Sequence, residues 1–149
     1  MNKFNPNRYQ GTWYEVGKYP VMYEPMPCSY SIAEYRYNSK GNYLNVLNTC
    51  YNRERQPVIS ITGIAKPRND KGEFLISFYP ESFAPYPVAP IPVPYDVLWT
   101  DYNNLAFVGG TPLSFYILAR DPSKVDMNFI KRKTAELGYD ISKVQFNYR

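Results

Sequence analysis

Hydrophobic and polar residues alternate in short runs along most of the first 120 positions, and turn-forming residues separate the runs. A period of two is typical of strands with one buried face. The closeness of the runs in sequence favours antiparallel pairing between neighbours. The pattern predicts eight strands, over residues 12–18, 30–37, 43–51, 58–66, 73–79, 96–102, 105–108 and 115–120.

Tight turns connect several of these predicted strands. Residues 38–41 and 69–72 are typical of hairpin connections, in which Gly41 and Gly72 are free to adopt a positive φ. A row of neighbouring antiparallel strands leaves two open edges unless the sheet closes on itself. We therefore predict an all-β fold, an eight-stranded antiparallel up-and-down β-barrel, whose interior is just wide enough for one small ligand.

One α-helix follows the predicted strands. The helix is predicted to begin either at Pro122 and Ser123 or at Asp126. It is predicted to end at Gly138, because glycine readily adopts the left-handed conformation that commonly ends a helix. One face carries side chains at helical spacing, and we expect it to pack on the barrel wall rather than on a partner. These side chains are Met127, Ile130, Thr134 and Leu137. Residues 143–148 predict a last short strand.

Residues 80–94 differ from the rest of the chain. They contain six of its 14 prolines and one charged residue, Glu81. Because proline lacks an N–H donor and holds φ, this stretch predicts a stiff loop and excludes a central strand. Either the loop folds onto its own barrel, or its apolar side chains form a lid or docking surface. Those side chains are Phe83, Tyr86, Val88, Ile91 and Val93.

Composition narrows the possible chemistry. The 149 residues predict one domain, 1–149, and include no histidine and two cysteines. Nucleophilic systems that pair Ser or Cys with His, and imidazole-ligated metal sites, are thereby excluded. We expect no enzyme, no metal and no cofactor. The formal charge of +4 is spread along the chain, so we expect no nucleic-acid partner.

Two features of the sequence concern membranes and export. No apolar run is long enough to predict a transmembrane helix. The first 15 residues are polar, which predicts no signal peptide in this numbering, whether it starts at a mature N-terminus or at an expression start.

Three short motifs, in order along the chain, resemble those of the lipocalin family. They are G-x-W at the first strand, T-D-Y at the end of the sixth, and an arginine late in the eighth. The matching residues are Gly11, Trp13, Thr100, Asp101, Tyr102 and Arg120. Trp13 is expected to plug the narrow end of the barrel, with Arg120 lying across its indole. We expect Asp101 to be a structural acceptor at a turn rather than a catalytic acid.

Further segments resemble the group formed by bacterial lipocalin and apolipoprotein D, among them Ala33–Tyr35 and Glu136–Asp140. The resemblance implies transport of a small lipophilic ligand in the barrel, for which a fatty acid or lysophospholipid suits a narrow apolar cavity. Matching segments and strand alternation select the candidate lining residues, for each of which plain core packing is the alternative. They are Ala33, Tyr35, Leu44, Val46, Asn48, Tyr116 and Leu118.

In lipocalins the first, third, fifth and seventh connections surround the open mouth of the barrel. Here the first contains Val21, Met22, Tyr23 and Met26, and the fifth is the proline-rich segment 80–94. We expect this apolar rim to be capped, or to dock onto a membrane surface or a protein, and a homodimer is one such arrangement. The alternative function is that of a structural or protein-interaction module, in which side chains fill the barrel and the rim binds a partner protein.

Cys28 and Cys50 flank the turn at 38–41 almost symmetrically, so a hairpin brings them roughly opposite each other. This predicts a disulfide, with two buried thiols as the alternative. A disulfide implies an oxidising compartment, so that the protein is secreted, periplasmic or particle-associated. The absence of histidine argues against an enzyme that uses either cysteine as a nucleophile.

Overall fold

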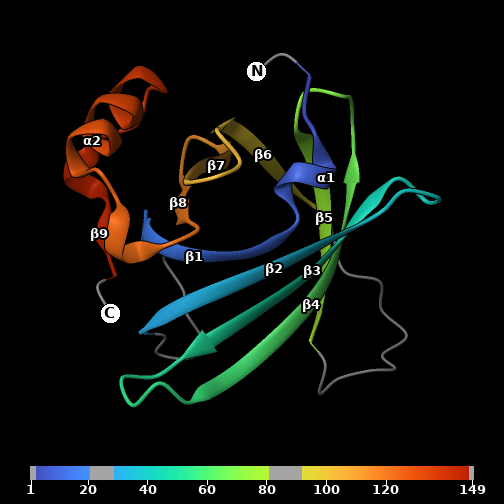
Figure 1. The fold of residues 1–149 in the computed structure, drawn as a ribbon, viewed down its shortest axis with the longest axis horizontal. Coiled ribbons are helices and arrows are strands. Elements are labelled where there is room, and N and C mark those ends of the chain that lie inside the picture. Colours follow the sequence, from blue (N-terminus) through green and yellow to red (C-terminus); the bar gives the residue numbers. More distant parts are fainter. Residues whose placement is uncertain (1–2, 21–28, 81–91, 148–149) are drawn as a thin grey trace.

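Within residues 3–20, 29–80 and 92–147, which a computed structural model describes, nine strands form one antiparallel sheet (Figure 1). The strands are β1 (Gly11–Lys18), β2 (Tyr30–Asn38), β3 (Tyr43–Tyr51), β4 (Pro57–Pro67), β5 (Glu73–Pro80), β6 (Val93–Thr100), β7 (Leu105–Thr111), β8 (Ser114–Ala119) and β9 (Gln145–Phe146).

The first eight strands close into a barrel. Each strand from β2 to β8 pairs with its neighbour in sequence, and β1 pairs with both β8 and β2. The closing register runs from Gly11 opposite Tyr35 to Tyr14 opposite Ile32. Beyond that point β9 takes the place of β2, because Gly17 and Lys18 pair with Phe146 and Gln145. The predicted eight-stranded up-and-down barrel is confirmed.

Strand alternation divides the buried side chains between two clusters. One cluster fills the barrel interior and includes Trp13, Val46 and Ile76. The other lies outside the wall and includes Phe107, Ile117 and Ile130. It is covered by α2 (Met127–Glu136), which lies beside β8 and β9 (Figure 1). The predicted packing of the helix on the barrel wall is thereby confirmed.

The helix begins later than one of the two predicted starts. Asp126 caps it by accepting hydrogen bonds from the N–H groups of Asn128 and Phe129, whereas residues Pro122–Lys124 form a separate 3₁₀ turn, η2. Asp126 is therefore the correct start. Gly138 follows the helix with φ +88°, a left-handed conformation that favours glycine, as predicted.

Several other predicted boundaries are wrong by a few residues. The predicted tail strand 143–148 consists only of β9, because Ile141–Lys143 form a second 3₁₀ turn, η3. The predicted loop 80–94 loses both its ends to strands, since Pro80 ends β5 and Val93 begins β6. Pro94 is accommodated opposite Leu75 because it lies close to the strand end, where one missing N–H is tolerated.

Two turns also differ from the prediction. The sixth strand ends at Thr100, and Tyr102 adopts φ +66° in the turn beyond it. In the hairpin after β2, Asn42 rather than Gly41 has the positive φ, which asparagine tolerates better than most residues; Gly72 has one, as predicted.

A short helix that the strand pattern did not predict, α1 (Pro6–Tyr9), precedes β1 (Figure 1). The side chain of Asn5 caps it, and proline occupies its first position. Within the described part of the chain, no helix has the length and apolar character needed to cross a membrane.

Candidate ligand-binding site

Aromatic side chains plug one end of the barrel. Trp13 and Tyr9 are fully buried, and the Trp13 indole N–H donates to the Tyr9 carbonyl at 2.9 Å. Phe4 packs edge-on against Tyr9 and Phe74, and its N–H donates to the carbonyl of Asp70 in the β4–β5 turn. The segment before β1 therefore lies across this end of the barrel and closes it.

Arg120 stabilises the closed end of the barrel. Its guanidinium lies 3.9 Å from the centre of the Trp13 ring and donates to three carbonyls, those of Thr12, Tyr102 and Arg8, at 3.0–3.1 Å. Gly11 permits this approach, since its φ is +103° and an added Cβ would lie 3.0 Å from Arg120 Nη1. The predicted contact between Arg120 and Trp13 is present, and it is structural.

The T-D-Y segment forms the turn between β6 and β7. The Thr100 hydroxyl donates to the Leu105 carbonyl at 2.7 Å and accepts from the Tyr102 N–H. Asp101 accepts from the N–H groups of Asn104 and Leu105 at 2.8 and 3.0 Å. Partial burial raises the pKa of Asp101, but these hydrogen bonds outweigh it and leave the pKa below its ordinary value. Asp101 therefore accepts hydrogen bonds as an ionised turn residue.

The structure brings the predicted lining residues together on the inner face of the barrel. Five of them belong to the buried interior cluster: Ala33, Tyr35, Leu44, Val46 and Leu118. Tyr116 is partly buried and packs against the same cluster. Asn48 lies opposite Ala33 and Ile61, so it points to the same face, and it is half-buried.

Two interior tyrosines were absent from the predicted set. The Tyr95 hydroxyl lies 2.7 Å from that of Tyr9 and 2.6 Å from that of Tyr35. Burial raises the pKa of all three phenols above the ordinary value, so they are neutral. Tyr95 alternates with the buried Val97, a signal that was available in the sequence. Tyr9 precedes the first strand, and no strand pattern includes it.

A pair of opposite charges inside the barrel was also missed. β1 contains an irregularity between Glu15 and Gly17, after which Lys18 lies opposite Tyr116 on the inner face. Strict alternation would have pointed Lys18 outward. Lys18 Nζ lies 3.9 Å from Glu15 Oε1, and the two side chains are 14% and 13% exposed. This pair lies toward the end of β1 that is far from the plug.

Accessibility of the inner face increases toward this second end. Ile76 in β5 is 2% exposed, whereas its pairing partner Val93, the first residue of β6, is 44% exposed. Leu113, in the turn between β7 and β8 at the same end, is 83% exposed. The other predicted rim residues fall in segments 21–28 and 81–91, outside the described residues.

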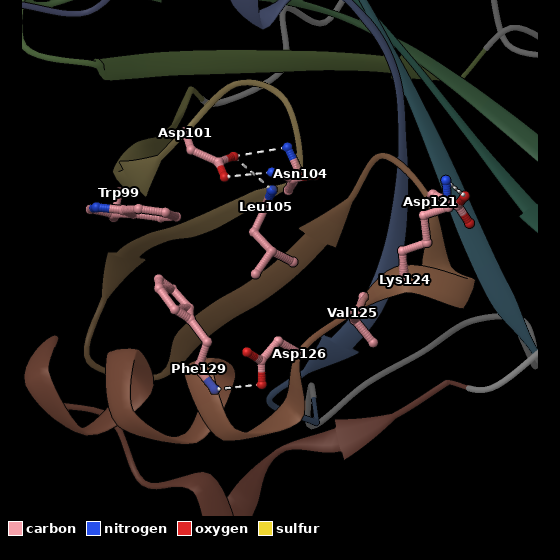
Figure 2. Close-up of a pocket in the computed structure, with 9 residues that line it drawn as sticks. All are labelled: Trp99, Asp101, Asn104, Leu105, Asp121, Lys124, Val125, Asp126 and Phe129. Atoms are coloured by element: carbon pink, nitrogen blue, oxygen red, sulfur yellow. Dashed lines mark hydrogen bonds and ion pairs between the residues drawn. The ribbon is translucent and has the colours of Figure 1, made fainter.

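A separate pocket of about 330 Å³ lies outside the barrel, between the β6–β7 turn and the start of α2 (Figure 2). Trp99 and Phe129, with ring centres 5.2 Å apart, form its apolar wall. Its carboxylates are used by the local backbone, since Asp101 holds the turn, Asp121 accepts from the Ser123 N–H and Asp126 caps α2. These hydrogen bonds stabilise the turn and the starts of the two helical segments, which explains why three acidic residues surround the pocket.

Two further predictions concern cysteine and metal. Cys50 is buried in β3, and the register places Ser31 opposite it, because the hairpin is centred between residues 40 and 41. Cys28 lies outside the described residues. Among residues 3–20, 29–80 and 92–147, no group of three or more His, Cys, Asp or Glu side chains is placed to hold a metal ion.

A closed eight-stranded antiparallel barrel that is plugged at one end is the architecture of ligand-binding β-barrel proteins. Comparison with known proteins identifies the family: residues 4–148 match the model of the lipocalin-like domain, and the chain belongs to that family. Lipocalins bind small hydrophobic ligands, and members are binding and transport proteins rather than enzymes.

Individual relatives agree with this assignment. Temperature-induced lipocalin-1 of Arabidopsis thaliana is 30% identical over 94% of this chain and 76% of its own length. Apolipoprotein D of Mus musculus is 30% identical over 97% of this chain and 76% of its own length. Among solved structures, the tryptamine complex of the amine binding protein of Rhodnius prolixus has a TM-score of 0.72 at 12% identity, over 99% of this chain and 82% of that one. This last likeness concerns the fold.

Proposed function

We propose that this protein binds one molecule of a single-chain amphiphile, a fatty acid or a lysophospholipid, inside the barrel. The observation that carries the proposal is the gradient along the inner face, from the fully buried Trp13 at the plug to the 44% exposed Val93 at the other end. Such a gradient is expected of a barrel that admits a ligand from one side only.

The distribution of polar groups supports an amphiphile with its chain pointing inward. Apolar side chains such as Val46 and Leu118 surround the middle of the barrel, where each buried CH₂ of a ligand contributes about 0.8 kcal/mol. Lys18, Asn48 and Tyr116 lie nearer the accessible end. The Lys18 ammonium is the group that a carboxylate or phosphate headgroup would contact there, in exchange for Glu15.

The test begins with native mass spectrometry of the purified protein, followed by titration with a fluorescent fatty acid. We expect near-unit stoichiometry. Asn48→Trp, which fills the inner face, should abolish binding, whereas Leu47→Trp on the outer face of the same strand should not. Lys18→Met should weaken binding of an acid more than Lys66→Met does, since Lys66 is exposed on β4. Absence of bound lipid together with no titration at tens of micromolar, a range typical of weak ligands, would contradict the proposal.

Docking through the rim is a second candidate function, and the exposed Leu113 is the observation that favours it. The partner we propose is an apolar surface of a membrane, with a homodimer or a protein gripped by a filled barrel as alternatives. Deletion of residues 84–92 should reduce sedimentation with phospholipid vesicles. Unchanged vesicle association and unchanged ligand affinity would refute docking. No role in nucleic-acid binding is proposed.

We also propose a disulfide between Cys28 and Cys50, and with it a secreted, periplasmic or particle-associated location. The buried position of Cys50 beside the start of β2 supports it. Alkylation of the unreduced, denatured protein should add no mass, and reduction should allow two alkyl groups to be added. Two alkyl groups without reduction would refute the bond.

A further inference from the structure

The pocket between the β6–β7 turn and the start of α2 combines an aromatic wall with an excess of negative charge (Figure 2). We refer to it as the outer pocket. Its volume of about 330 Å³ is at the lower end of the range of roughly 300–1,000 Å³ that ligand pockets occupy. Trp99 and Phe129 form its aromatic wall, and Leu105 and Val125 add apolar surface. The outer pocket lies outside the barrel wall and has no part in the proposed binding of a fatty acid.

Four charged side chains line the outer pocket, and their charges do not cancel. Asp101, Asp121 and Asp126 contribute three negative charges and Lys124 one positive charge, so the pocket has a net charge of −2 in a chain of formal charge +4. Lys124 does not fill the pocket, since its side chain is 81% exposed and lies 4.0 Å from Asp121. Hydrogen bonds from the Ser123 hydroxyl and N–H hold the pKa of Asp121 below its ordinary value. The pocket therefore attracts cations at neutral pH.

Capping of α2 leaves acceptor capacity in the outer pocket. Asp126 accepts from the N–H groups of both Asn128 and Phe129 with Oδ1 alone. Its Oδ2 has no recorded hydrogen bond or ion pair among the residues that the structure describes. Figure 2 shows the Asp126 carboxylate between Val125 and Phe129, with one oxygen bonded to the helix. A negatively charged acceptor thus lies beside an aromatic ring.

The aromatic wall already attracts one ammonium group of the protein itself. Lys133 Nζ lies 5.1 Å from the Trp99 ring centre and 5.8 Å from that of Phe129, and it also pairs with Glu136 at 2.9 Å. Lys133 does not line the outer pocket, so it approaches the two rings from outside. The negative faces of aromatic rings attract cations in general. The contact with Lys133 shows that these two rings are placed to do so.

We propose that the outer pocket binds a protonated amine with a compact apolar group, which packs against Trp99 and Phe129 while the ammonium group donates to Asp126 Oδ2. The aromatic wall attracts the positive charge, and an ionic hydrogen bond to the carboxylate fixes its position. An anion would be repelled by the net charge of the pocket. A metal ion fits less well, since no group of three or more His, Cys, Asp or Glu side chains in the described part of the chain is placed to hold one.

The experiment compares phenethylamine, which is protonated at neutral pH, with 2-phenylethanol, which has nearly the same shape and no charge. Each is titrated into the purified, ¹⁵N-labelled protein and followed by NMR. The chain contains two tryptophans, so two indole N–H signals report on two places. Trp99 lines the outer pocket, whereas Trp13 donates to the Tyr9 carbonyl in the plug of the barrel. A Trp99→Phe variant assigns the two signals.

We expect phenethylamine to shift the Trp99 signal saturably and to bind about tenfold more tightly than 2-phenylethanol, with the Trp13 signal unmoved. Asp126→Asn should reduce this ratio to about threefold or less, because asparagine keeps the cap and loses the charge. Asp140→Asn is the matched control and should leave the ratio unchanged. Asp140 caps η3 by accepting from the Ser142 N–H, and it does not line the outer pocket.

Equal dissociation constants for the two probes would overturn the inference, and so would a shift of the Trp13 signal in place of the Trp99 signal. The absence of a saturable shift up to about 20 mM phenethylamine would overturn it too. If Asp126→Asn does not fold, Asp121→Asn replaces it, because Asp121 caps η2 through Ser123 just as Asp140 caps η3. An unchanged ratio in the variant used would refute the assigned role of the carboxylates.

Discussion

Replacement of Arg120 by methionine tests the physical account of the closed end. Methionine keeps the apolar stem over Trp13 and removes the guanidinium, which donates to three carbonyls. The bond to the Arg8 carbonyl is exposed, and water replaces it at little cost. The bonds to Thr12 and Tyr102 are partly buried, and their acceptors lose a charged donor.

The magnitude follows from these contacts. Two partly buried hydrogen bonds from a charged donor contribute about 1–1.5 kcal/mol each once partial solvation is allowed for. The cation–π contact with Trp13 adds about 0.5–2 kcal/mol. We therefore expect Arg120→Met to lower the free energy of unfolding by about 2.5–5 kcal/mol.

Urea unfolding followed by tryptophan fluorescence and circular dichroism provides the measurement. Arg8→Met is the matched control, because it removes the same charge and a cation that lies 4.5 Å from the Tyr102 ring centre, at an exposed site. It should cost less than about 1 kcal/mol. Equal losses in the two variants would refute the assigned role, and an Arg120→Lys variant as stable as the wild type would show that the forked geometry of arginine is not needed.

Three further predictions concern single side chains. Thr134 is fully buried between α2 and the barrel, and its hydroxyl has no hydrogen-bond partner among the described residues, so Thr134→Val should raise the free energy of unfolding by about 1 kcal/mol in a urea titration; a loss of stability would reveal a missed partner. Gly138→Ala should lower it by about 1–2 kcal/mol, because φ is +88° while no atom lies within 4 Å of the added Cβ; a neutral effect would show that the turn relaxes. Asp101 has a lowered pKa in the folded state, so its ionised form stabilises the fold above the ordinary value of 3.8, and this contribution is lost as the pH falls through the lower folded value. Asp101→Asn should therefore be less stable than the wild type at pH 7, and the difference should shrink below about pH 4; a pH-independent difference would contradict the reasoning.

The sequence was sufficient for the barrel because its two main signals are local. Alternating side chains marked all eight strands, and the Asn- and Gly-rich turns fixed their order. Closure of the barrel was predicted because an open sheet leaves unpaired backbone N–H and C=O groups along its two edges. The same alternation placed Tyr35, Val46 and Leu118 on one face, where the structure brings them together.

The predictions of inward-facing residues failed in two situations. In one, an extra residue in a strand shifts the alternation, and in the other the segment lies outside the strands. The irregularity in β1 turns Lys18 inward, and no local pattern reveals an extra residue in a strand. Tyr9 reaches the interior from a four-residue helix that precedes the sheet. Tyr95 directly follows a run of prolines that predicts a loop, so the start of β6 is hidden in the sequence.

The pairing of β1 also has a consequence for the time course of folding. Along one side, β1 pairs with β8, as in the pairing of Tyr14 with Ala119. At its far end, β1 also pairs with β9, as in the pairing of Gly17 with Phe146. More than a hundred residues must be synthesised between the two members of each pair. At about 5–20 residues per second, the first strand can pair with β2 early but waits roughly 5–20 seconds before β8 and β9 emerge. Closure of the barrel is therefore a late step with high contact order, and ligand capture must come after it.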